Sequence, residues 1–546
     1  MKNRNYPLYD VETFNNLKEL VNYTSAQFGD EPAFTYERKK VKASTSYRQF
    51  RSDIEALGTC MFGEGSGRRT VAVIGENSYE WILTYFAVVN SGNIIVPLDK
   101  ELPVAEIKNL LDDSGAEILV HSDDYSDVAE KLRATGADIS RYINMDSLQE
   151  MIARGLTAIE GGATAIVEYV IDDHELAALL YTSGTTGKPK GVMLSHFNLA
   201  SDAASAGRNI DVSSNNMLVL PIHHSFGFTA AVCAPMLKCS ETCINSSLKN
   251  VLSDMVKYKP GFMFLVPLFV ETFYKKIWDT AKKQGKDGLL KRMIGLSNAL
   301  LKVGIDLRRV FFKSVLDSFG GNLNMAISGG APLDDRYVKG FRSLGVNLLN
   351  GYGITECAPV VSVNRNFFYR DGSIGQVLDR CKVKIADPDE SGHGEICVSG
   401  DIVMLGYYKN EQATNDAFDG EWFKTGDIGY LDRDGFLFIS GRKKNLIILN
   451  NGKNVYPEEI ESELLGIEYI KEALVYAEDN AIVAEVFPDT ENFPDCASRL
   501  DGDIIALNKA LPIYKNIGKT KIREVEFPKT TTKKIIRDYG EGVSHD

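Results

Sequence analysis

The sequence lacks the residue patterns that mark metal, disulfide and hydrolase chemistry. Its eight cysteines form no C-x-x-C pair and do not cluster with the seven histidines, which argues against both a zinc site and a disulfide scaffold. Neither G-x-S-x-G nor H-E-x-x-H occurs, so no motif supports a serine hydrolase or a zinc protease. We therefore expect most of the cysteines to be small buried hydrophobic residues.

Long apolar runs and an excess of positive charge are also missing. No uninterrupted apolar stretch approaches a membrane span, and residues 1–5 carry no apolar segment typical of export signals, so a cytoplasmic location is expected. The net charge is −13, whereas nucleic-acid binding needs a basic surface that displaces counterions from phosphates. The composition argues against nucleic acid as the main partner.

One segment departs from this acidic balance. Residues 275–313 hold eleven Lys or Arg against three Asp, a local net charge of +8, interleaved with Leu, Ile, Met and Phe. A solvated helical face is one explanation of this pattern. The other is a docking surface for anionic lipid, CoA or acyl carrier protein, which would include peripheral contact with a membrane.

The order of apolar and turn-forming stretches predicts an α/β protein. With 546 residues, of which 44% are hydrophobic, the chain is long enough for more than one core. Residues 70–99 read as strand, turn, long helix and strand, and similar alternation further along predicts largely parallel sheets covered by helices. Residues 374–439 show short strands with Gly and Asp turns, which predicts a small antiparallel barrel or sheet. A compact α+β unit with a helix at 457–465 is expected beyond residue 444, and residues 192–194 are strand-like.

The most informative motif is YTSGTTGKPKGVMLSH at residues 181–196. Glycines let backbone N–H groups approach an anion, hydroxyls add donors, and lysines supply positive charge. Gly184 and Gly187 are separated by two residues, whereas a Walker A loop has four before its Gly-Lys pair, which disfavours an ordinary P-loop NTPase. Taken alone, the motif leaves both phosphate binding and a simple turn open.

This loop resembles the phosphate-binding motif of the adenylate-forming enzymes, the family of acyl-CoA ligases, luciferases and peptide-synthetase adenylation domains. Six further segments recur in that family's order. They are LPIHHSFGF at 220–228, SGGAPL at 328–333, NGYGITE at 350–356, WFKTGDIGYL at 422–431, SGRKKNLIILNNGKNVYPEEIE at 440–461 and PKTTTKKIIR at 528–537. Seven matches in the expected order make the resemblance specific from residue 182 to residue 537.

The resemblance implies a large N-terminal domain of layered α/β subdomains plus a small β-barrel, followed by a small mobile α+β C-terminal domain. It places the domains at residues 1–441 and 446–546, with a hinge at 442–445. In the implied reaction a carboxylate attacks the α-phosphorus of ATP to give an acyl-adenylate and pyrophosphate, and a thiol then displaces AMP. The implied cofactors are ATP, Mg²⁺ and CoA or the phosphopantetheine of acyl carrier protein.

The resemblance also assigns nucleotide contacts within the implied N-terminal domain. Tyr352 would stack on adenine, Thr355 would donate to the α-phosphate, and Glu356 would hold Mg²⁺, which prefers carboxylate and phosphate oxygens. A buried tyrosine and a helix-capping Thr-Glu pair are the structural alternatives. The residues expected to cradle the β- and γ-phosphates are Thr182, Ser183, Gly184, Thr185, Thr186 and Lys190.

Two further segments are expected to contact the acyl group. The residues without side-chain bulk in SGGAPL, namely Gly329, Gly330 and Ala331, would let adenine and the acyl carbonyl approach the backbone. In LPIHHSFGF, His224 would contact the carboxylate and the adenylate, although a hydrogen-bonded structural histidine is the alternative. Phe226, Gly227 and Phe228 would leave an uncharged acceptor region, whereas amino-acid-activating relatives place Asp at the position of Gly227.

The C-terminal motifs imply ribose, lysine and thiol roles. Asp427 would accept both ribose hydroxyls, Arg442 would donate to the ribose, and Gly452 would line the path of the pantetheine thiol. The lysine that enters the site during adenylation is assigned to Lys534. The family usually has Gly before this lysine, whereas Lys533 stands there in this chain.

The preferred acid is expected to be a medium- or long-chain fatty acid. About sixty basic, helix-prone residues separate positions 267 and 328, an insert in which the chain resembles long-chain fatty acid CoA ligases. The acceptor thiol is expected to be that of CoA, with a ligase for acyl carrier protein as the alternative. A nucleotide-binding regulatory protein without catalysis is the rival from another class. The sequence leaves the oligomeric state open.

Overall fold

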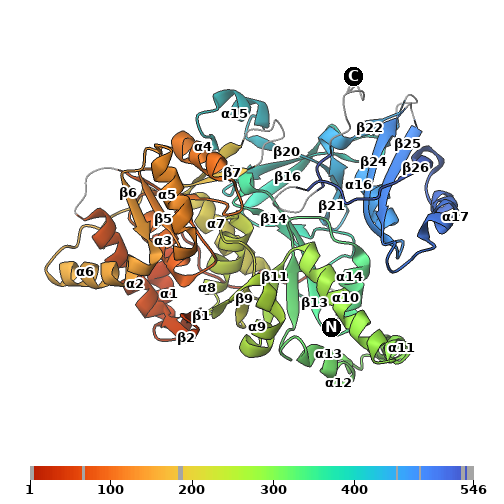
Figure 1. The fold of residues 1–546 in the computed structure, drawn as a ribbon, viewed down its shortest axis with the longest axis horizontal. Helices are drawn as coiled ribbons and strands as arrows, with labels where there is room; N and C mark the ends of the chain where they lie inside the picture. The colour runs from red at the N-terminus through yellow and green to blue at the C-terminus, as the bar shows by residue number, and fades with distance from the viewer. Residues whose placement is uncertain are drawn as a thin grey trace. The chain divides into compact units, whose positions relative to one another are not determined.

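The computed structural model describes residues 5–63, 68–182, 189–449, 453–478, 481–529 and 535–537. The chain divides into two compact units. Unit 1 consists of Met1–Val383 and Val398–Phe423, and unit 2 of Lys384–Cys397 and Lys424–Asp546. Unit 1 is the larger, mainly N-terminal part and unit 2 the smaller, mainly C-terminal part (Figure 1). The domain bounds at 1–441 and 446–546 and the hinge at 442–445 remain predictions.

The first sheet of unit 1 has seven strands in the order β18-β8-β7-β4-β3-β5-β6. Strands β3 to β7 pair in parallel, whereas β8 runs antiparallel to both β7 and β18. The bounds are β3 Thr70–Ile74, β4 Ile94–Pro97, β5 Ile118–His121, β6 Arg141–Asn144, β7 Leu176–Thr182, β8 Lys190–Ser195 and β18 Gly406–Tyr407.

The predicted strand, helix and strand at 70–99 are confirmed as β3, α3 and β4. Ser78 caps α3 by accepting from the Trp81 N–H, and nearly every side chain of that helix is buried. The other helices of this region are α1 Leu17–Phe28, α2 Tyr47–Phe62, α4 Val104–Ser114, α5 Ser126–Ala134, α6 Leu148–Glu160 and α7 His196–Asn209. Because β3 after Thr70 and all of β4 are apolar, helices can cover both faces of the sheet.

The second sheet of unit 1 has nine strands in the order β15-β14-β13-β12-β11-β9-β10-β1-β2. Its central strands are parallel, as predicted, and its outer pairs are antiparallel. The bounds are β1 Pro32–Arg38, β2 Val41–Ser46, β9 Asn216–Leu218, β10 Thr242–Ile244, β11 Phe262–Leu265, β12 Met325–Ser328, β13 Asn347–Gly353, β14 Val360–Val363 and β15 Gln376–Val377.

The basic segment of the sequence is helical. It spans α10 Pro267–Lys283, α11 Asp287–Lys302, α12 Arg308–Phe311 and α13 Lys313–Asp317, and α14 Asp335–Ser343 follows β12. These helices and α9 Val251–Tyr258 bury apolar side chains such as Val270, Phe273 and Leu290 in one core with β9, β11 and β12. The π-helix η3 (Phe226–Cys233) and α8 (Ala234–Met236) precede β10.

A five-stranded sheet forms the predicted small β element between residues 374 and 439. Its order is β16-β17-β20-β19, with β21 also paired to β20, and the β19–β20 and β20–β21 pairs are antiparallel. Its bounds are β16 Cys381–Ala386, β17 Gly394–Gly400, β19 Phe418–Asp419, β20 Trp422–Leu431 and β21 Leu437–Arg442; α15 Glu411–Ala417 precedes β19. The chain passes from one unit to the other within β16, β17 and β20.

The rest of unit 2 is the predicted α+β unit. A three-stranded sheet of β24 Ile470–Glu478, β25 Ala481–Pro488 and β26 Ile517–Ile522 packs with α16 Pro457–Leu465 and α17 Cys496–Ala510 around one core. The predicted helix at 457–465 is confirmed, with Pro457 in its first turn, where a missing N–H costs nothing. The short pair β22 Ile447–Ile448 and β23 Asn454–Val455 precedes α16.

All eight cysteines are free, and six of them are buried, as predicted. In the described parts of the chain, no helix combines the length and the apolar character that crossing a bilayer requires.

Candidate active site

Two of the predicted motifs follow neighbouring parallel strands of unit 1. Ser328 at the end of β12 pairs with Asn350 of β13, so SGGAPL and NGYGITE leave the same edge of the sheet. Strand β11 pairs with β12 on the other side, and the Gly329 N–H donates to the Leu265 carbonyl over 3.1 Å. Ligands of open α/β sheets bind outside the carboxyl ends of the strands. The fold therefore sets both motifs where such a site forms.

The SGGAPL loop presents bare backbone. Gly330 has φ +82°, a conformation that favours glycine, and both Gly330 and Ala331 are exposed. A Cβ on Gly329 would stand 3.1 Å from Cζ of Phe226, so that glycine is needed for close packing against an aromatic ring. This arrangement agrees with the close approach that a planar ligand would make.

The side chains of Glu356, Tyr407 and Lys190 form one cluster. The Tyr407 hydroxyl donates to Oε1 of Glu356 over 2.9 Å, and Nζ of Lys190 lies 4.9 Å from the centre of the Tyr407 ring. Burial and the Glu356 charge both raise the pKa of Tyr407, so it stays a neutral donor. The structure thus joins the predicted metal carboxylate to the predicted phosphate lysine through a tyrosine.

The turn that carries Thr355 and Glu356 is held from several sides. It forms the 3-10 helix η5 (Thr355–Cys357), and the Glu356 carbonyl accepts from the Met404 N–H over 2.9 Å. Just beyond it, the Val360 N–H donates to Oδ1 of Asp202 on α7 over 3.0 Å. Asp202 is fully buried, and burial raises its pKa well above the usual range. The turn is therefore anchored by α7 and by the chain before β18.

A cavity of about 390 Å³ opens beside this cluster. Its walls are polar and apolar in similar measure, and Lys190 supplies a positive charge to them. It is lined by Lys190, Tyr407, Asn410, Gln412, Ala413, Asp416 and Ala417.

The predicted phosphate loop is the connection between the antiparallel strands β7 and β8. Thr182 and Lys190 are directly opposite in this hairpin, at the ends of the two strands. The predicted Ser183, Gly184, Thr185 and Thr186 lie outside the described residues.

Of the two histidines in LPIHHSFGF, His223 is the structural one. Its Nε2 lies 3.6 Å from Oδ1 of Asp99, and burial holds its pKa well below the usual value, so the ring is neutral. The rings of His223 and His224 are 4.1 Å apart, and both residues are half-buried. His224 stays the predicted ligand-facing member.

The apolar residues after these histidines have two different environments. Phe226 packs edge-on against Phe264 and faces Gly329, whereas Phe228 is buried and stacks on Tyr85 with ring centres 3.6 Å apart. A Cβ on Gly227 would come within 2.2 Å of the Pro221 carbonyl oxygen. Gly227 is therefore fixed by backbone packing, and Phe228 belongs to the core, so of these three residues Phe226 is the one that could line the predicted acceptor region.

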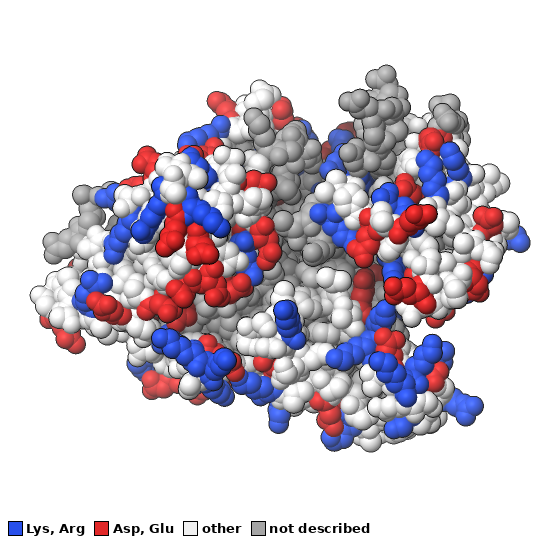
Figure 2. Space-filling model, in the orientation of Figure 1, with Lys and Arg blue, Asp and Glu red and all other residues white. Residues whose placement is uncertain are grey.

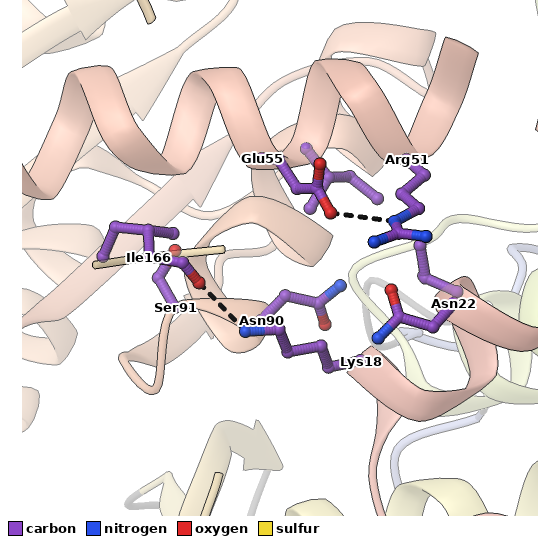
Figure 3. A pocket seen from close by; sticks show the side chains of 9 residues that line it. Lys18, Asn22, Arg51, Glu55, Asn90, Ser91 and Ile166 are labelled. Atoms are coloured by element: carbon purple, nitrogen blue, oxygen red, sulfur yellow. Dashed lines mark hydrogen bonds and ion pairs between the residues drawn. The ribbon is translucent and has the colours of Figure 1, made fainter. Parts of the chain in front are cut away.

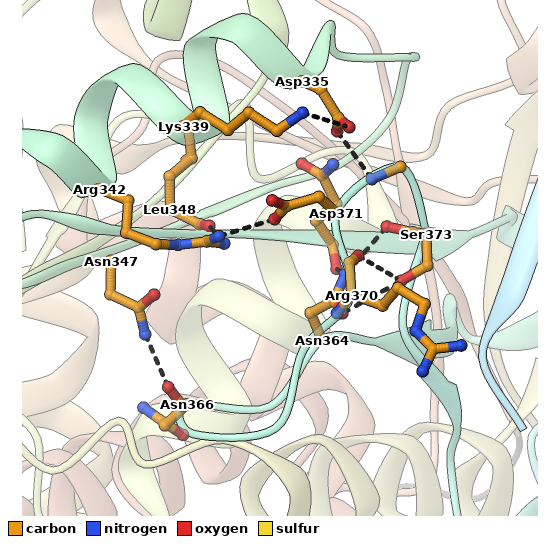
Figure 4. A network of polar contacts seen from close by, with 12 residues as sticks. Asp335, Lys339, Arg342, Asn347, Leu348, Asn364, Asn366, Arg370, Asp371 and Ser373 are labelled. Carbon is orange, nitrogen blue, oxygen red and sulfur yellow. Dashed lines mark hydrogen bonds and ion pairs between the residues drawn. The ribbon is translucent and has the colours of Figure 1, made fainter. Parts of the chain in front are cut away.

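Polar contacts fix the strand that leads into NGYGITE (Figure 4). Asn364 donates from its backbone and its side chain to the Asn350 carbonyl, over 2.9 and 3.3 Å, and Asn347 donates to the Asn366 carbonyl over 2.9 Å. Arg342 of α14 pairs with Asp371 at 2.7 Å. These contacts hold β13 beside the loop at 364–373, and Tyr352 follows as a side chain that is 8% exposed.

In unit 2, Asp427 and Arg442 face each other across β20 and β21. Nε of Arg442 lies 2.8 Å from Oδ1 of Asp427, whose side chain is only 4% exposed. Next to them, Lys443 pairs with Glu395 at 2.7 Å. The two predicted ribose residues are thus brought together as an ion pair, and a ribose would have to compete with Arg442 for the carboxylate.

The predicted Lys534 and Gly452 lie outside the described residues, but the segments next to Lys534 are held by unit 2. Lys529 forms an antiparallel bridge with Ile535 and pairs with Glu472. Arg537 pairs with the buried Glu461 of α16, whose other oxygen accepts from the Val475 N–H over 2.7 Å. Both ends of the segment that carries Lys534 are therefore anchored on the same core.

Three residues of these arrangements were missed by sequence reasoning. Nothing in GYYKN separates Tyr407 from Tyr408, and Asp202 reads as an ordinary polar residue of a helix. The signal for Arg537 was its place in PKTTTKKIIR, three residues after the predicted lysine.

A small cavity elsewhere in unit 1 has a structural role (Figure 3). Its volume is about 10 Å³, which is room for a single water. Nζ of Lys18 donates to the carbonyls of Ile166 and Tyr169 over 2.9 and 2.7 Å, and burial lowers the pKa of Lys18 to about 8. Lys18 thereby holds α1 to the segment after α6, and the cavity is too small for a substrate.

A protein-family model described as AMP-binding enzyme matches residues 21–408 of this chain. The chain belongs to the AMP-binding enzyme family. Among curated relatives of this AMP-binding enzyme, long-chain-fatty-acid–CoA ligase FadD15 of Mycobacterium bovis is 28% identical over 521 residues, covering 87% of this chain and 86% of the relative. A long-chain-fatty-acid–CoA ligase of Salmonella typhimurium is 26% identical over 575 residues, covering 96% and 94%.

Solved structures show the same fold at lower identity. A fatty acyl CoA synthetase of Mycobacterium tuberculosis matches with a TM-score of 0.67 and 24% identity, covering 96% of this chain and 97% of that one. The anthranilate CoA ligase AuaEII in complex with anthranoyl-AMP matches with a TM-score of 0.75 and 20% identity, covering 98% and 97%. These structures support the fold of the AMP-binding enzyme and are silent on its acid.

Proposed function

We propose that this AMP-binding enzyme is an AMP-forming acid–thiol ligase. It activates a medium- or long-chain fatty acid with ATP to an acyl-adenylate, releasing pyrophosphate, and then transfers the acyl group to the thiol of CoA. The observation that carries the proposal is the cluster of Lys190, Tyr407 and Glu356, in which the predicted phosphate lysine and the predicted metal carboxylate meet beside a cavity. Both reactants of the first half are anions, so catalysis consists of aligning them among cations and fixed donors.

In this account, Lys190 and Thr182 flank the loop that holds the β- and γ-phosphates. Lys190 rests over the Tyr407 ring, which positions its charge without neutralising it. Thr355 donates to the α-phosphate, Tyr352 stacks on adenine, and the buried Gly329 with the exposed Gly330 and Ala331 borders the adenine and the carbonyl. His224 contacts the acyl carboxylate.

Glu356 fits the Mg²⁺ that accompanies ATP. Mg²⁺ in nucleotide sites is held by one or two carboxylates, with phosphate oxygens and water completing its shell. Glu356 is half-buried on a turn fixed at its own carbonyl, and Tyr407 occupies one of its oxygens. Bound there, the ion would offset negative charge on the phosphates.

The second half of the reaction needs unit 2. We assign the adenylation lysine to Lys534, the ribose contacts to Asp427 and Arg442, and the thiol path to the backbone at Gly452. A turn of the C-terminal part about residues 442–445 would present Lys534 and then Gly452. The anchors at Lys529 and Arg537 support this assignment, because they would keep the lysine segment in place while the unit moves.

A fatty acid is favoured over an amino acid as the substrate. Phe226 is the aromatic side chain that faces the SGGAPL loop, and Gly227 has no room for a carboxylate that could pair with an amino group. The curated relatives at 26–28% identity are named long-chain-fatty-acid–CoA ligases.

The test is a panel of acids of increasing chain length assayed for pyrophosphate release and for thioester product. Each acid is offered with CoA and, separately, with a holo acyl carrier protein. We expect pyrophosphate release that depends on medium or long acids, and acyl-CoA as the product. Pyrophosphate release that does not depend on an added acid would contradict the proposal. If thioester formed only on the carrier protein, the acceptor would be the carrier protein and not CoA.

A further inference from the structure

The helices α10 to α13 of unit 1 form a surface, here called the insert surface, that is both basic and apolar. Its net charge of +8 over residues 275–313 stands against −13 for the whole chain. In the space-filling view, Lys and Arg side chains gather over the region that these helices occupy in Figure 1 (Figure 2). The exposed cations are Lys275, Lys276, Lys282, Lys283, Lys286, Lys291, Arg292, Lys302, Arg309 and Lys313.

Most of these cations are not neutralised by the protein itself. Lys313 pairs with Asp317, Arg309 donates to backbone carbonyls, and Lys291 lies over the ring of Trp278. Among the described residues, no ion pair joins an acid to the other exposed cations of α10 and α11. A solvated helical face in an acidic protein would more often carry alternating charges that pair at i,i+4 spacing.

The outer side of α11 carries an apolar line. Leu289, Leu296 and Val303 recur every seven residues and are 56%, 55% and 73% exposed. The adjoining side of the same helix supplies Leu290, which is buried, and partly buried neighbours such as Met293 and Ile294 to the core. The apolar side of the helix is therefore only partly covered by the protein.

Exposed apolar side chains continue along the neighbouring helices. Leu268 of α10, Ile305 before α12 and Val310 of α12 are 55%, 47% and 70% exposed. Exposed apolar groups that gather in one region mark an interaction site rather than ordinary surface. They share α10 and α11 with lysines that have no ion-pair partner among the described residues, and they continue to α12.

We propose that the insert surface docks peripherally on a lipid bilayer that contains anionic lipids. Lysines are attracted to an anionic headgroup layer, and leucine and valine side chains can enter the boundary between headgroups and acyl chains. An acidic protein partner would account for the lysines, but it would not account for the exposed apolar line of α11. A second copy of this chain would bring two surfaces of charge +8 together, which repel.

The experiment is vesicle flotation of the full chain without added substrates. One set of vesicles contains phosphatidylglycerol mixed with phosphatidylcholine, and the other contains phosphatidylcholine alone. We expect binding to the anionic vesicles only, and a steep loss of that binding as salt is raised.

Two variants separate the contributions of charge and of apolar contact. Lys275→Gln/Lys276→Gln/Lys282→Gln/Lys283→Gln should weaken binding to anionic vesicles about 100-fold, and Leu289→Gln/Leu296→Gln/Val303→Gln about tenfold. All seven positions are exposed, so both variants should keep the far-ultraviolet circular dichroism of the parent. The matched control is Lys39→Gln/Lys40→Gln/Lys42→Gln on the β1–β2 turn, three exposed lysines beside the exposed Val41. It should bind as the parent does.

Several results would overturn the proposal. These are absence of binding to anionic vesicles at low salt, equal binding to both kinds of vesicle, or equal weakening by the control variant. The proposal would also be overturned if the apolar variant changed only the oligomeric state measured by light scattering. A lysine variant that weakened capture of a holo acyl carrier protein but left vesicle binding unchanged would overturn it as well.

Discussion

The two units hold their candidate cations in opposite ways. In unit 1, Lys190 rests on the ring of Tyr407, and among the described residues no acid forms an ion pair with it. In unit 2, Arg442, Lys443 and Arg537 are paired with Asp427, Glu395 and Glu461. Unit 1 thus keeps a positive charge available beside a cavity, whereas these three cations of unit 2 form ion pairs within that unit.

This difference suggests a division of labour. An unneutralised lysine suits the binding of an anion such as ATP. Ion-paired cations suit a scaffold that carries one exposed group into place and stays rigid while doing so. On this account unit 1 binds and polarises the nucleotide, and unit 2 supplies Lys534 from a segment whose two ends are anchored.

The largest effect is expected for Lys534→Ala. Removing a cation that acts in the transition state should lower acyl-adenylate formation about 1,000-fold. Thioester formation from supplied acyl-adenylate should stay within about threefold of the parent, because that half does not use this lysine. The two half-reactions are measured separately, by pyrophosphate release and by acyl-CoA formation.

The adjacent lysine is the matched control. Lys533→Ala removes the same charge one residue earlier, where the family usually has Gly. It should reduce adenylation by less than about fivefold. Equal losses for Lys533→Ala and Lys534→Ala, or equal loss of both half-reactions, would contradict the assignment of Lys534.

Glu356→Gln tests the metal role in unit 1. The amide oxygen can still accept from Tyr407, so the change removes the charge and little else. Adenylation should fall about 100-fold, and the concentration of Mg²⁺ needed for half-maximal rate should rise. Glu130→Gln on the exposed side of α5 is the control and should match the parent. An unchanged Mg²⁺ dependence would remove Glu356 from the metal site.

Acid should destabilise unit 1 through His196. This residue is 1% exposed, and burial lowers its pKa to about 4 from 6.5, so the unfolded chain binds a proton that the folded chain does not. Stability is complete above pH 6.5 and is lost as pH falls from 6.5 towards 4, by about 2 kcal/mol at pH 5. His223 acts in the same direction.

The measurement is denaturant unfolding at pH 7 and pH 5 for the parent and for His196→Asn. The variant should show a pH dependence that is smaller by about 2 kcal/mol. If both proteins lose the same free energy of unfolding between these pH values, His196 does not carry the effect.

The smallest expected effect is that of Tyr407→Phe. It removes the hydroxyl that donates to Glu356 and keeps the ring beneath Lys190, so kcat/KM should fall about tenfold. Tyr408→Phe changes the neighbouring tyrosine and should leave the rate unchanged. A larger loss of kcat/KM for Tyr408→Phe than for Tyr407→Phe would contradict the proposed role of Tyr407 in the cluster.

The sequence predicted the parts whose signal is local. The alternation at 70–99, the helix at 457–465 and the hairpin strand after the glycine-rich loop all follow from apolar spacing and turn residues, and the structure confirms them. The motif order was enough to recognise the family that residues 21–408 match.

What the sequence could not predict depends on contacts between distant segments. Tyr407 reaches Glu356 across fifty-one positions, and Asp202 reaches the Val360 N–H across 158. The packing of Gly227 against Pro221 and of Phe228 against Tyr85 also becomes visible only in three dimensions. These residues differ from their sequence neighbours only in what they contact in the folded protein, and no local sequence pattern encodes such contacts.

The central claim is that this chain joins a fatty acid to AMP. Exchange of labelled pyrophosphate into ATP measures that step directly and reversibly, with no need for the acceptor thiol. With Mg²⁺ present, exchange should depend on a medium- or long-chain fatty acid and should fall to background without it. Exchange at background for every acid offered, from protein shown to be folded, would contradict the account.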